Sequence, residues 1–269
     1  MIIIGEKING TRRRVAQAIV ERDHEFIKDL ARKQAEGGAH YLDVNAGTSP
    51  DREPEDMVWL IENIQEVVDL PLCLDSANPA ALESGLQVVK RPALINSLSG
   101  EKARIEGVLP LAGKYQTGLV VLALDDLTGI PKRSEERLEI VSKLVGLAEE
   151  QGLSHEQLFI DPLVTAISTG VDSGMVTFET IKGIRQRYPA AHITCGLSNI
   201  SFGLPLRSLI NRTFLAMCMM CGLDSAIIDP NDRELMGVLL AAEMLLGRDA
   251  YCRGFLGAYR AGRIGPPTK

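Results

Sequence analysis

Eight short runs of apolar and β-branched residues recur along the chain, and longer charged stretches with helical spacing separate them. Such runs predict buried strands, and a helix between successive strands predicts a parallel sheet covered on both faces. The predicted strands are 2–6, 41–45, 71–76, 93–97, 119–124, 158–162, 193–199 and 225–229. The predicted helices are 23–36, 55–68, 101–115, 135–151, 176–188, 208–220 and 233–246, with a short one at 79–89. This alternation predicts an α/β fold.

The number of strand–helix units favours a closed barrel over an open, doubly wound sheet. The 269 residues divide into eight units of about 30 residues, and barrels of this type need about 250 residues. The sequence shows no linker rich in Pro or Gly and no change of composition between its halves. We therefore expect a single-domain (β/α)8 TIM barrel over residues 1–269, with a flexible tail at about 260–269.

Composition and charge exclude several classes of protein. The formal net charge is −6, with acidic and basic residues interspersed, so no basic stripe is available to bind nucleic acid. The five cysteines form no disulfide-like pattern, which is typical of a reducing compartment. The sequence contains neither a signal peptide nor an apolar run near the roughly 18 residues of a membrane span. We expect a cytoplasmic protein that does not contact the membrane.

Polar side chains occur at the end of nearly every predicted strand. They are Glu6, Asn9, Asp43, Asn45, Asp75, Ser76, Asn96, Ser97, Asp161, Ser198, Asn199 and Asp229. In a barrel the carboxyl ends of the strands share one face, where active sites form. A pocket rich in carboxylates and carboxamides and poor in cations suits a neutral heterocycle with several N–H donors. The alternative interpretation is that these side chains cap helix N-termini.

At these positions the chain resembles the pterin-binding methyltransferases. The resemblance is to the methyltetrahydrofolate:corrinoid protein methyltransferases and, more distantly, to the folate-binding barrel of cobalamin-dependent methionine synthase. The segments that carry it are Ile-Gly-Glu-Lys-Ile-Asn-Gly (4–10), Leu-Asp-Val-Asn-Ala-Gly (42–47), Leu-Cys-Leu-Asp-Ser (72–76), Leu-Ile-Asn-Ser (94–97), Ile-Asp-Pro-Leu (160–163), Gly-Leu-Ser-Asn-Ile-Ser (196–201) and Leu-Ile-Asn-Arg-Thr-Phe-Leu (209–215). The resemblance implies transfer of a methyl group between N5 of tetrahydrofolate and the cobalt of a corrinoid.

The resemblance also implies roles for individual residues. Asp75, Asn96 and Asp161 are expected to bind the pterin edge, and Asn199 to reach N5. The other expected pocket residues are Gly196, Ser198, Glu6, Asp43, Asn45 and Arg207, with Asn9 and Ile227 as weaker candidates. Because a carboxamide can donate or accept a hydrogen bond, Asn199 suits either direction of transfer. Water held by Asp43, Asn45 or Asp75 is the expected proton route, which makes Asp75 the second catalytic candidate.

Tetrahydrofolate or 5-methyltetrahydrofolate is the expected substrate, and a partner must carry the cobalamin. One barrel uses the whole chain, and no Asp-x-His-x-x-Gly corrinoid signature occurs. We expect a transient complex with a corrinoid protein over the strand ends, and the resemblance implies a homodimer. No metal site is expected in the chain itself. The direction of methyl transfer stays open.

Two alternative functions compete with methyl transfer. The first is a non-catalytic protein that binds or stores folate. The second is an enzyme similar to dihydropteroate synthase, a family with a lysine after the seventh strand and an Arg-x-His after the eighth. Here these places hold Leu-Ser-Asn (197–199) and Ile-Ile-Asp-Pro (227–230). They contain no cation, so pyrophosphate chemistry is disfavoured.

The remaining polar motifs have structural interpretations. His40 and His192 lie at the entering ends of their strands, away from the active face, so no catalytic histidine is expected. Cys218 and Cys221, with the methionines at 217, 219 and 220, occupy an apolar helix without a second ligand pair, which indicates helix packing. The charged runs 135–137 and 12–14 are expected to be solvated faces, although the second run could approach the folate tail or a partner.

Overall fold

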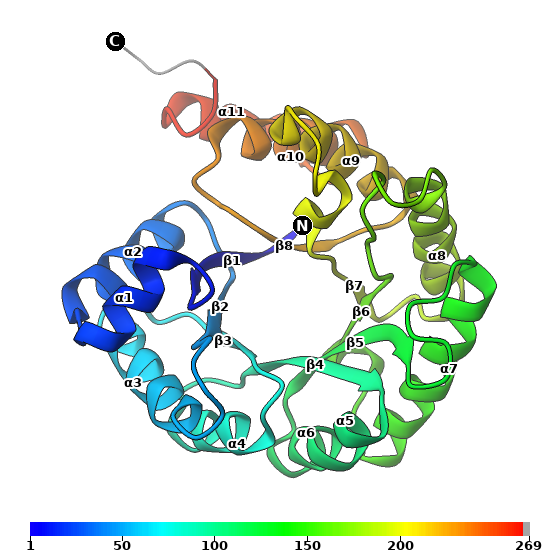
Figure 1. Cartoon of the computed structure of the whole chain (residues 1–269). Helices are drawn as coiled ribbons and strands as arrows, with labels where there is room; N and C mark the ends of the chain where they lie inside the picture. The colour runs from blue at the N-terminus through cyan, green and yellow to red at the C-terminus, as the bar shows by residue number, and fades with distance from the viewer. Residues whose placement is uncertain (266–269) are drawn as a thin grey trace.

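The computed structural model describes residues 1–265 as a barrel of eight parallel strands surrounded by helices (Figure 1). The strands are β1 (Ile2–Asn9), β2 (Tyr41–Asn45), β3 (Leu72–Asp75), β4 (Leu94–Gly100), β5 (Gly118–Asp125), β6 (Leu158–Asp161), β7 (His192–Ile193) and β8 (Ser225–Ile228). They pair in the order β7-β6-β5-β4-β3-β2-β1-β8. Strands consecutive in sequence are therefore neighbours in space, and β1 lies between β2 and β8. The predicted TIM barrel is confirmed.

The helices form the outer layer of the barrel (Figure 1). They are α1 (Arg13–Glu21), α2 (His24–Glu36), α3 (Glu53–Gln65), α4 (Pro79–Val88), α5 (Lys102–Gly107), α6 (Leu109–Tyr115), α7 (Ser134–Glu150), α8 (Ser173–Arg187), α9 (Arg207–Cys221), α10 (Arg233–Leu245) and α11 (Arg253–Arg260). In α7 the buried residues Val141, Leu144, Val145 and Ala148 recur at helical spacing and face the strands. Within residues 1–265, none of these helices has both the length and the apolar character of a membrane crossing.

The observed helices differ from the predicted set in three places. The predicted helix 101–115 is two helices, α5 and α6, which meet at Val108. Pro110 lies in the first turn of α6, where the missing N–H of proline is tolerated. Helices α1 and α11 are absent from the predicted set, although Val15, Ala18 and Ile19 of α1 are buried at helical spacing.

Part of the expected C-terminal tail packs on the barrel. Residues 266–269 lie outside the described residues. Within 260–265, Ile264 is buried, and Arg233 donates hydrogen bonds to the carbonyls of Gly262 and Gly265. These contacts hold the segment against α10.

The seventh strand is much shorter than the predicted run 193–199. Only His192 and Ile193 form β7, and residues 197–201 form a 3-10 helix, η2 (Leu197–Ser201). Between them, the N–H of Thr194 donates to Ile160 O at 3.0 Å and Cys195 O accepts from the N–H of Ile227 at 3.1 Å. The barrel thus closes through irregular backbone at this point, and the prediction of a full strand is wrong.

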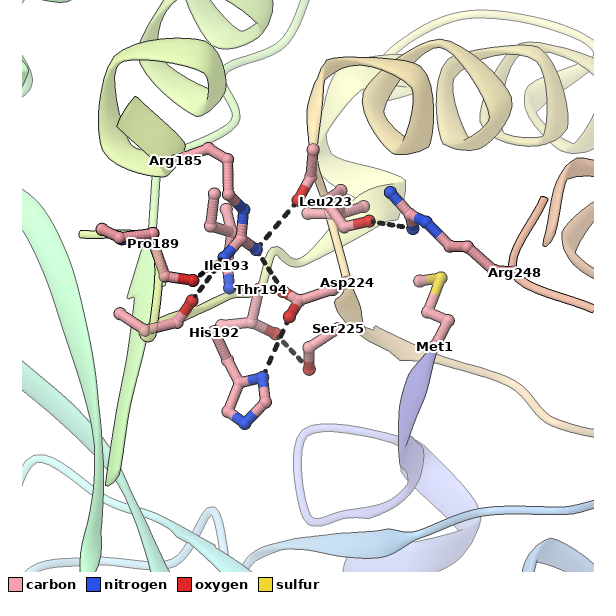
Figure 2. Close-up of polar contacts among 12 residues, drawn as sticks. Met1, Arg185, Pro189, His192, Ile193, Thr194, Leu223, Asp224, Ser225 and Arg248 are labelled. Atoms are coloured by element: carbon pink, nitrogen blue, oxygen red, sulfur yellow. Dashed lines mark hydrogen bonds and ion pairs between the residues drawn. The ribbon is translucent and has the colours of Figure 1, made fainter. Parts of the chain in front are cut away.

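At the entering end of the barrel, Asp224 immediately precedes β8, and its side chain bonds to residues of β7 (Figure 2). Its carboxylate accepts from the N–H of Ile193 at 2.7 Å, lies 3.1 Å from Arg185 Nη2 and lies 3.0 Å from His192 Nδ1. Burial opposes ionisation, but the hydrogen bonds from His192 and Ile193 outweigh it and lower the pKa of Asp224. His40, before β2, accepts from the N–H of Ile3 at 3.1 Å. Both histidines lie at the entering end, as predicted.

An apolar floor fills the barrel below the strand ends. Ile4, Cys73, Leu94, Val120 and Phe159 form a buried cluster, with Leu122 and Ile227 packed against it. Side chains two residues apart on a strand share one face. Three predicted site residues, Asp75, Asn96 and Asp161, follow Cys73, Leu94 and Phe159 by two positions. They therefore lie inside the barrel, directly above its floor.

Candidate functional site

Five of the predicted site residues lie on β1 to β4, and we call them the strand wall: Glu6, Asp43, Asn45, Asp75 and Asn96. Asn45 Nδ2 donates to Asp75 Oδ2 at 2.9 Å, and Asn96 Nδ2 donates to Asp43 Oδ1 at 3.4 Å. Asp75 and Asn96 are also register partners of neighbouring strands. The structure therefore brings carboxylates and carboxamides together in alternation, as the strand-end pattern predicts.

The two aspartates of the strand wall share an electrostatic environment that favours a bound proton. Burial, reinforced by the negative charge of Asp75, raises the pKa of Asp43. Burial also raises the pKa of Asp75, against the opposing effects of Asn45 and Arg104. Two carboxyls that raise each other's pKa titrate as a pair, so the pair retains a proton at pH values at which isolated carboxyls are ionised. The strand wall can therefore donate as well as accept hydrogen bonds.

A supporting network behind β3 was not found from the sequence. Ser76 Oγ donates to Glu53 Oε1 at 2.6 Å, and Arg104 Nη1 donates to Ser76 O at 2.9 Å. Ser76, the residue after Asp75, is buried, and it links the end of β3 to α3 and α5. A buried serine after a strand carries no specific pattern, so no sequence signal identifies this network.

Two cations, Lys7 and Arg12, lie at the rim of the barrel mouth, and both are paired with carboxylates. Lys7 Nζ lies 2.6 Å from Asp229 Oδ2, and Arg12 Nη2 lies 2.8 Å from Glu6 Oε1. The expectation of a pocket poor in cations therefore needs correction at β1 and β8, because Lys7 belongs to β1 and sits beside the end of β8. Asn9, a weaker candidate, accepts hydrogen bonds from Thr11 in a local turn. Ile227, the other weaker candidate, packs on the apolar floor.

The other predicted site residues lie across the mouth. Four of them lie on β6 and at η2, and we call these the turn wall: Asp161, Gly196, Ser198 and Asn199. The fifth, Arg207, is the first residue of α9. Asp161 is buried, and its Oδ1 accepts from the N–H of Leu163 at 2.7 Å. Burial raises the pKa of Asp161 to about 6, although the N–H groups of Leu163 and Gly196 and the charge of Arg137 oppose the rise. Asp161 is therefore an oriented acceptor.

Asn199 is the exposed member of the turn wall. A Cβ added at Gly196 would lie 3.2 Å from Asn199 Nδ2, so a glycine there leaves room for this side chain. Arg207 holds the turn from outside, since its Nη2 donates to Ser198 O at 2.9 Å and its Nε to Ser201 Oγ at 3.1 Å. Asn199 is therefore an exposed side chain on a braced turn.

Two interpretations of the remaining motifs need correction. Arg137 is only 2% exposed, so the expected solvated face 135–137 is wrong at this residue, whereas residues 12–14 are exposed as expected. In α9, Cys218 and Met219 are buried, in agreement with helix packing, but Met217 and Met220 are 48% and 72% exposed. The methionine cluster is therefore only partly a packing feature.

Comparison with known proteins identifies the family. The family model described as pterin binding enzyme matches residues 5–229. The chain belongs to the pterin binding enzyme family. It is 44% identical over 267 residues to the methylcorrinoid:tetrahydrofolate methyltransferase of Eubacterium limosum, a match that covers 99% of this chain and 98% of that protein. The family resemblance of the sequence motifs is confirmed.

Two further similarities agree with this family. The chain is 31% identical over 241 residues to the methionine synthase of Mycobacterium leprae (strain TN), covering 85% of this chain and 20% of that protein. It therefore spans about a fifth of that relative's length. A dihydropteroate synthase of Coxiella burnetii, solved in complex with pteroic acid, has a TM-score of 0.66 at 14% identity and covers 91% of this chain and 92% of that chain. This second likeness concerns the fold.

Proposed function

We propose that this chain is a methyltransferase that moves a methyl group from the corrinoid of a partner protein to N5 of tetrahydrofolate. The observation that carries the proposal is the 44% identity with the methylcorrinoid:tetrahydrofolate methyltransferase over nearly the full length of both proteins. The name of that relative gives the methylcorrinoid as donor, and we propose the same direction here. The geometry of the mouth supports a pterin as the acceptor.

The proposed pterin site uses acceptors from both walls. Asp75, Asn96 and Asp161 bind the edge that carries the amino and ring N–H groups, because an ionised carboxylate can accept two adjacent N–H bonds. The apolar floor contacts the ring. Glu6, Asp43 and Asn45 line the strand side of the pocket, and Gly196 and Ser198 line the turn side.

Asn199 is the proposed catalytic residue at N5. When N5 forms its bond to the methyl carbon, it releases its proton, and the electron pair of the broken carbon–cobalt bond stays with the cobalt. The corrinoid on the partner supplies the methyl group. A carboxamide can accept from the N5 proton before transfer and donate to the N5 lone pair in the reverse direction. Asp75 is the second proposed catalytic residue, since the Asp43–Asp75 pair can take up a proton through water.

The corrinoid partner is proposed to dock over the strand ends, because the methyl carbon must reach N5 beside Asn199.

We also propose a homodimer, and the exposed apolar side chains of α8 and α9 are candidates for its interface: Met175, Leu209, Met217 and Met220. A cytoplasmic location is proposed because all five cysteines are free thiols. Light scattering of the purified protein measures the oligomeric state directly.

The experiment that tests the proposed function is anaerobic incubation of the protein with methylcobalamin and tetrahydrofolate. The expected result is loss of the methylcobalamin spectrum with formation of an equal amount of 5-methyltetrahydrofolate. The methylated corrinoid protein replaces free methylcobalamin in a parallel reaction. Binding of tetrahydrofolate without transfer from either donor would contradict catalysis and favour a storage protein.

A further inference from the structure

Arg137, near the start of α7, is a buried cation that holds three backbone carbonyls. Its Nε donates to Pro131 O at 3.0 Å, and its Nη1 donates to Pro162 O at 2.8 Å and to Leu163 O at 2.7 Å. Within residues 1–265, no carboxylate lies within 4.0 Å of its guanidinium group. Burying a guanidinium without an ion pair is unfavourable. A residue kept in such a place is therefore expected to have a specific role.

The segment that Arg137 holds positions a hydrogen bond on Asp161. Leu163 has a φ of 64°, which places a branched side chain in the left-handed region, where such residues are strained. This backbone turn directs the N–H of Leu163 onto Asp161 Oδ1 at 2.7 Å. The carbonyls on either side of that turn are the ones that Arg137 binds. Release of the two carbonyls would let the turn relax and would remove the N–H from Asp161.

We propose that Arg137 is a positioning residue: it clamps the turn after β6 so that the Asp161 carboxylate stays oriented and ionised to accept the N–H edge of the pterin. This inference rests on the proposed function, since it assigns Asp161 to pterin binding. Arg137 acts through Asp161 and Leu163, and it does not touch the substrate itself. No sequence motif marks it, because it stands in an ordinary charged run, Glu-Glu-Arg, at 135–137.

Few charged or titratable groups affect Asp161. The pH dependence of binding can therefore report the ionisation of this one carboxyl. The N–H groups of Leu163 and Gly196 and the charge of Arg137 favour the ionised form. The buried thiol of Cys195 is the other titratable neighbour, and burial keeps the pKa of that thiol well above its ordinary value. Among the described residues, Arg137 is therefore the only side-chain charge that lowers the pKa of Asp161, and its loss should move the ionisation of Asp161 to higher pH.

The test compares two arginines that clamp carbonyls at opposite ends of the barrel. Arg185 binds the carbonyls of Pro189, Ala191 and Gly222 at 3.0, 2.8 and 3.0 Å, at the entering end (Figure 2). The variants are Arg137→Met, Arg137→Lys and the control Arg185→Met. Tetrahydrofolate affinity is measured anaerobically by calorimetry from pH 5.5 to 8.5. The kcat and KM for tetrahydrofolate are measured with methylcobalamin as donor.

Arg137→Met is expected to weaken tetrahydrofolate binding about 10- to 100-fold at pH 7, by analogy with loss of a charge-assisted contact. Its binding midpoint should move to higher pH, and KM should rise while kcat changes less than about threefold. Arg137→Lys keeps the charge, so it should restore the pH midpoint and part of the affinity. Arg185→Met should lower thermal stability and leave the affinity and the midpoint unchanged.

Three outcomes overturn the inference. Wild-type affinity and midpoint in a folded Arg137→Met would show that the clamp is structural only. If Arg137→Met does not fold, wild-type affinity in Arg137→Lys, which lacks the guanidinium fork, leads to the same conclusion. An equal affinity loss in Arg185→Met would show a general effect of destabilisation. A wild-type protein that binds no tetrahydrofolate would overturn the proposed function, and this inference with it.

Discussion

The strand wall and the turn wall face each other across one barrel mouth, but they are built differently. The strand wall stands on paired strands, although the register shifts near Glu6 in β1 and near Asn96 in β4. Four of its five members bond to one another, Asn45 to Asp75 and Asn96 to Asp43. The turn wall stands on irregular backbone, and arginines outside the pocket hold it, Arg207 at η2 and Arg137 at the turn after β6. Side chains that are hydrogen-bonded to one another are held in place and suit recognition of the pterin edge. An exposed side chain on a braced turn suits contact with the reacting atom N5.

The Asn199→Ala variant tests the difference between the two walls most directly. Asn199→Ala is expected to lower kcat for methyl transfer about 100-fold, because it removes a single contact that strengthens in the transition state. The Kd for tetrahydrofolate should change less than about threefold, since the strand wall still binds the edge. Stopped-flow spectroscopy of methylcobalamin loss measures kcat, and calorimetry measures Kd. Ser208→Ala, in the exposed first turn of α9, is the matched control. Transfer at the wild-type rate would remove Asn199 from the mechanism.

The second prediction tests whether the stability of the barrel can change without an effect on either wall. Asp224→Asn weakens the junction of β7 and β8 at the entering end, and it should lower the free energy of unfolding at pH 7 by about 2 kcal/mol. The pKa of Asp224 is lowered in the folded state, so its contribution is present above the unfolded-state pKa and lost as pH falls through the folded-state pKa. Urea unfolding at pH 7 and pH 3 measures this.

In the same variant, kcat and Kd at 25 °C should stay at wild-type values. A change in either quantity would show that the entering end communicates with the mouth, which would weaken the separation of the walls from the rest of the barrel.

The third prediction concerns recognition by the strand wall. Asn96→Ala removes a donor and an acceptor, and it should weaken tetrahydrofolate binding about tenfold, the effect of one net hydrogen bond of about 1.4 kcal/mol. Its kcat at saturating substrate should fall less than about threefold. Calorimetry and steady-state kinetics measure the two quantities. A variant with normal affinity and a low kcat would reverse the roles assigned to the two walls.

The same contrast explains which parts of the molecule the sequence predicts. The strand wall follows from period-two spacing, since Asp75 and Asn96 stand two positions after the buried residues Cys73 and Leu94 on one face of each strand. Their positions in the barrel could therefore be predicted. The motif around Asn199 predicts its place in the mouth but assigns its backbone to a strand, because η2 arises where β7 stops pairing, and this depends on tertiary contacts.

Arg207 was predicted near the mouth, but two other residues that act from outside the pocket, Arg137 and Lys7, were not. Burial of Arg137 depends on the carbonyls of Pro131, Pro162 and Leu163, which are brought together only by the folded chain. Lys7 was missed for the same reason, since its partner Asp229 is at the far end of the sequence. Helix α1 could have been predicted from the spacing of its buried residues, but the arginines before it indicate a solvated loop.

The smallest predicted effect tests the shared proton of the strand wall. The pKa of Asp43 is raised in the folded state, so its contribution to stability is fully present below the unfolded-state pKa and is lost as pH rises through the folded-state pKa. Asp43→Asn removes this loss of stability at high pH, because an amide cannot ionise. The amide can also donate to the Asp75 carboxylate, as a protonated Asp43 does. The free energy of unfolding should exceed that of the wild type by about 1 kcal/mol at pH 8 and by less at pH 5.

Urea unfolding at the two pH values measures the difference, with Asp224→Asn as a control whose pH dependence has the opposite sign. In that control the loss of stability is larger at high pH, because Asp224 is stabilised in its ionised form. In Asp43→Asn the gain is larger at high pH, because Asp43 is held in its protonated form. Equal stability changes at pH 5 and pH 8 in Asp43→Asn would mean that Asp43 is ionised in the folded protein. The two aspartates of the strand wall would then act only as hydrogen-bond acceptors, and as carboxylates they could still take up the proton released from N5.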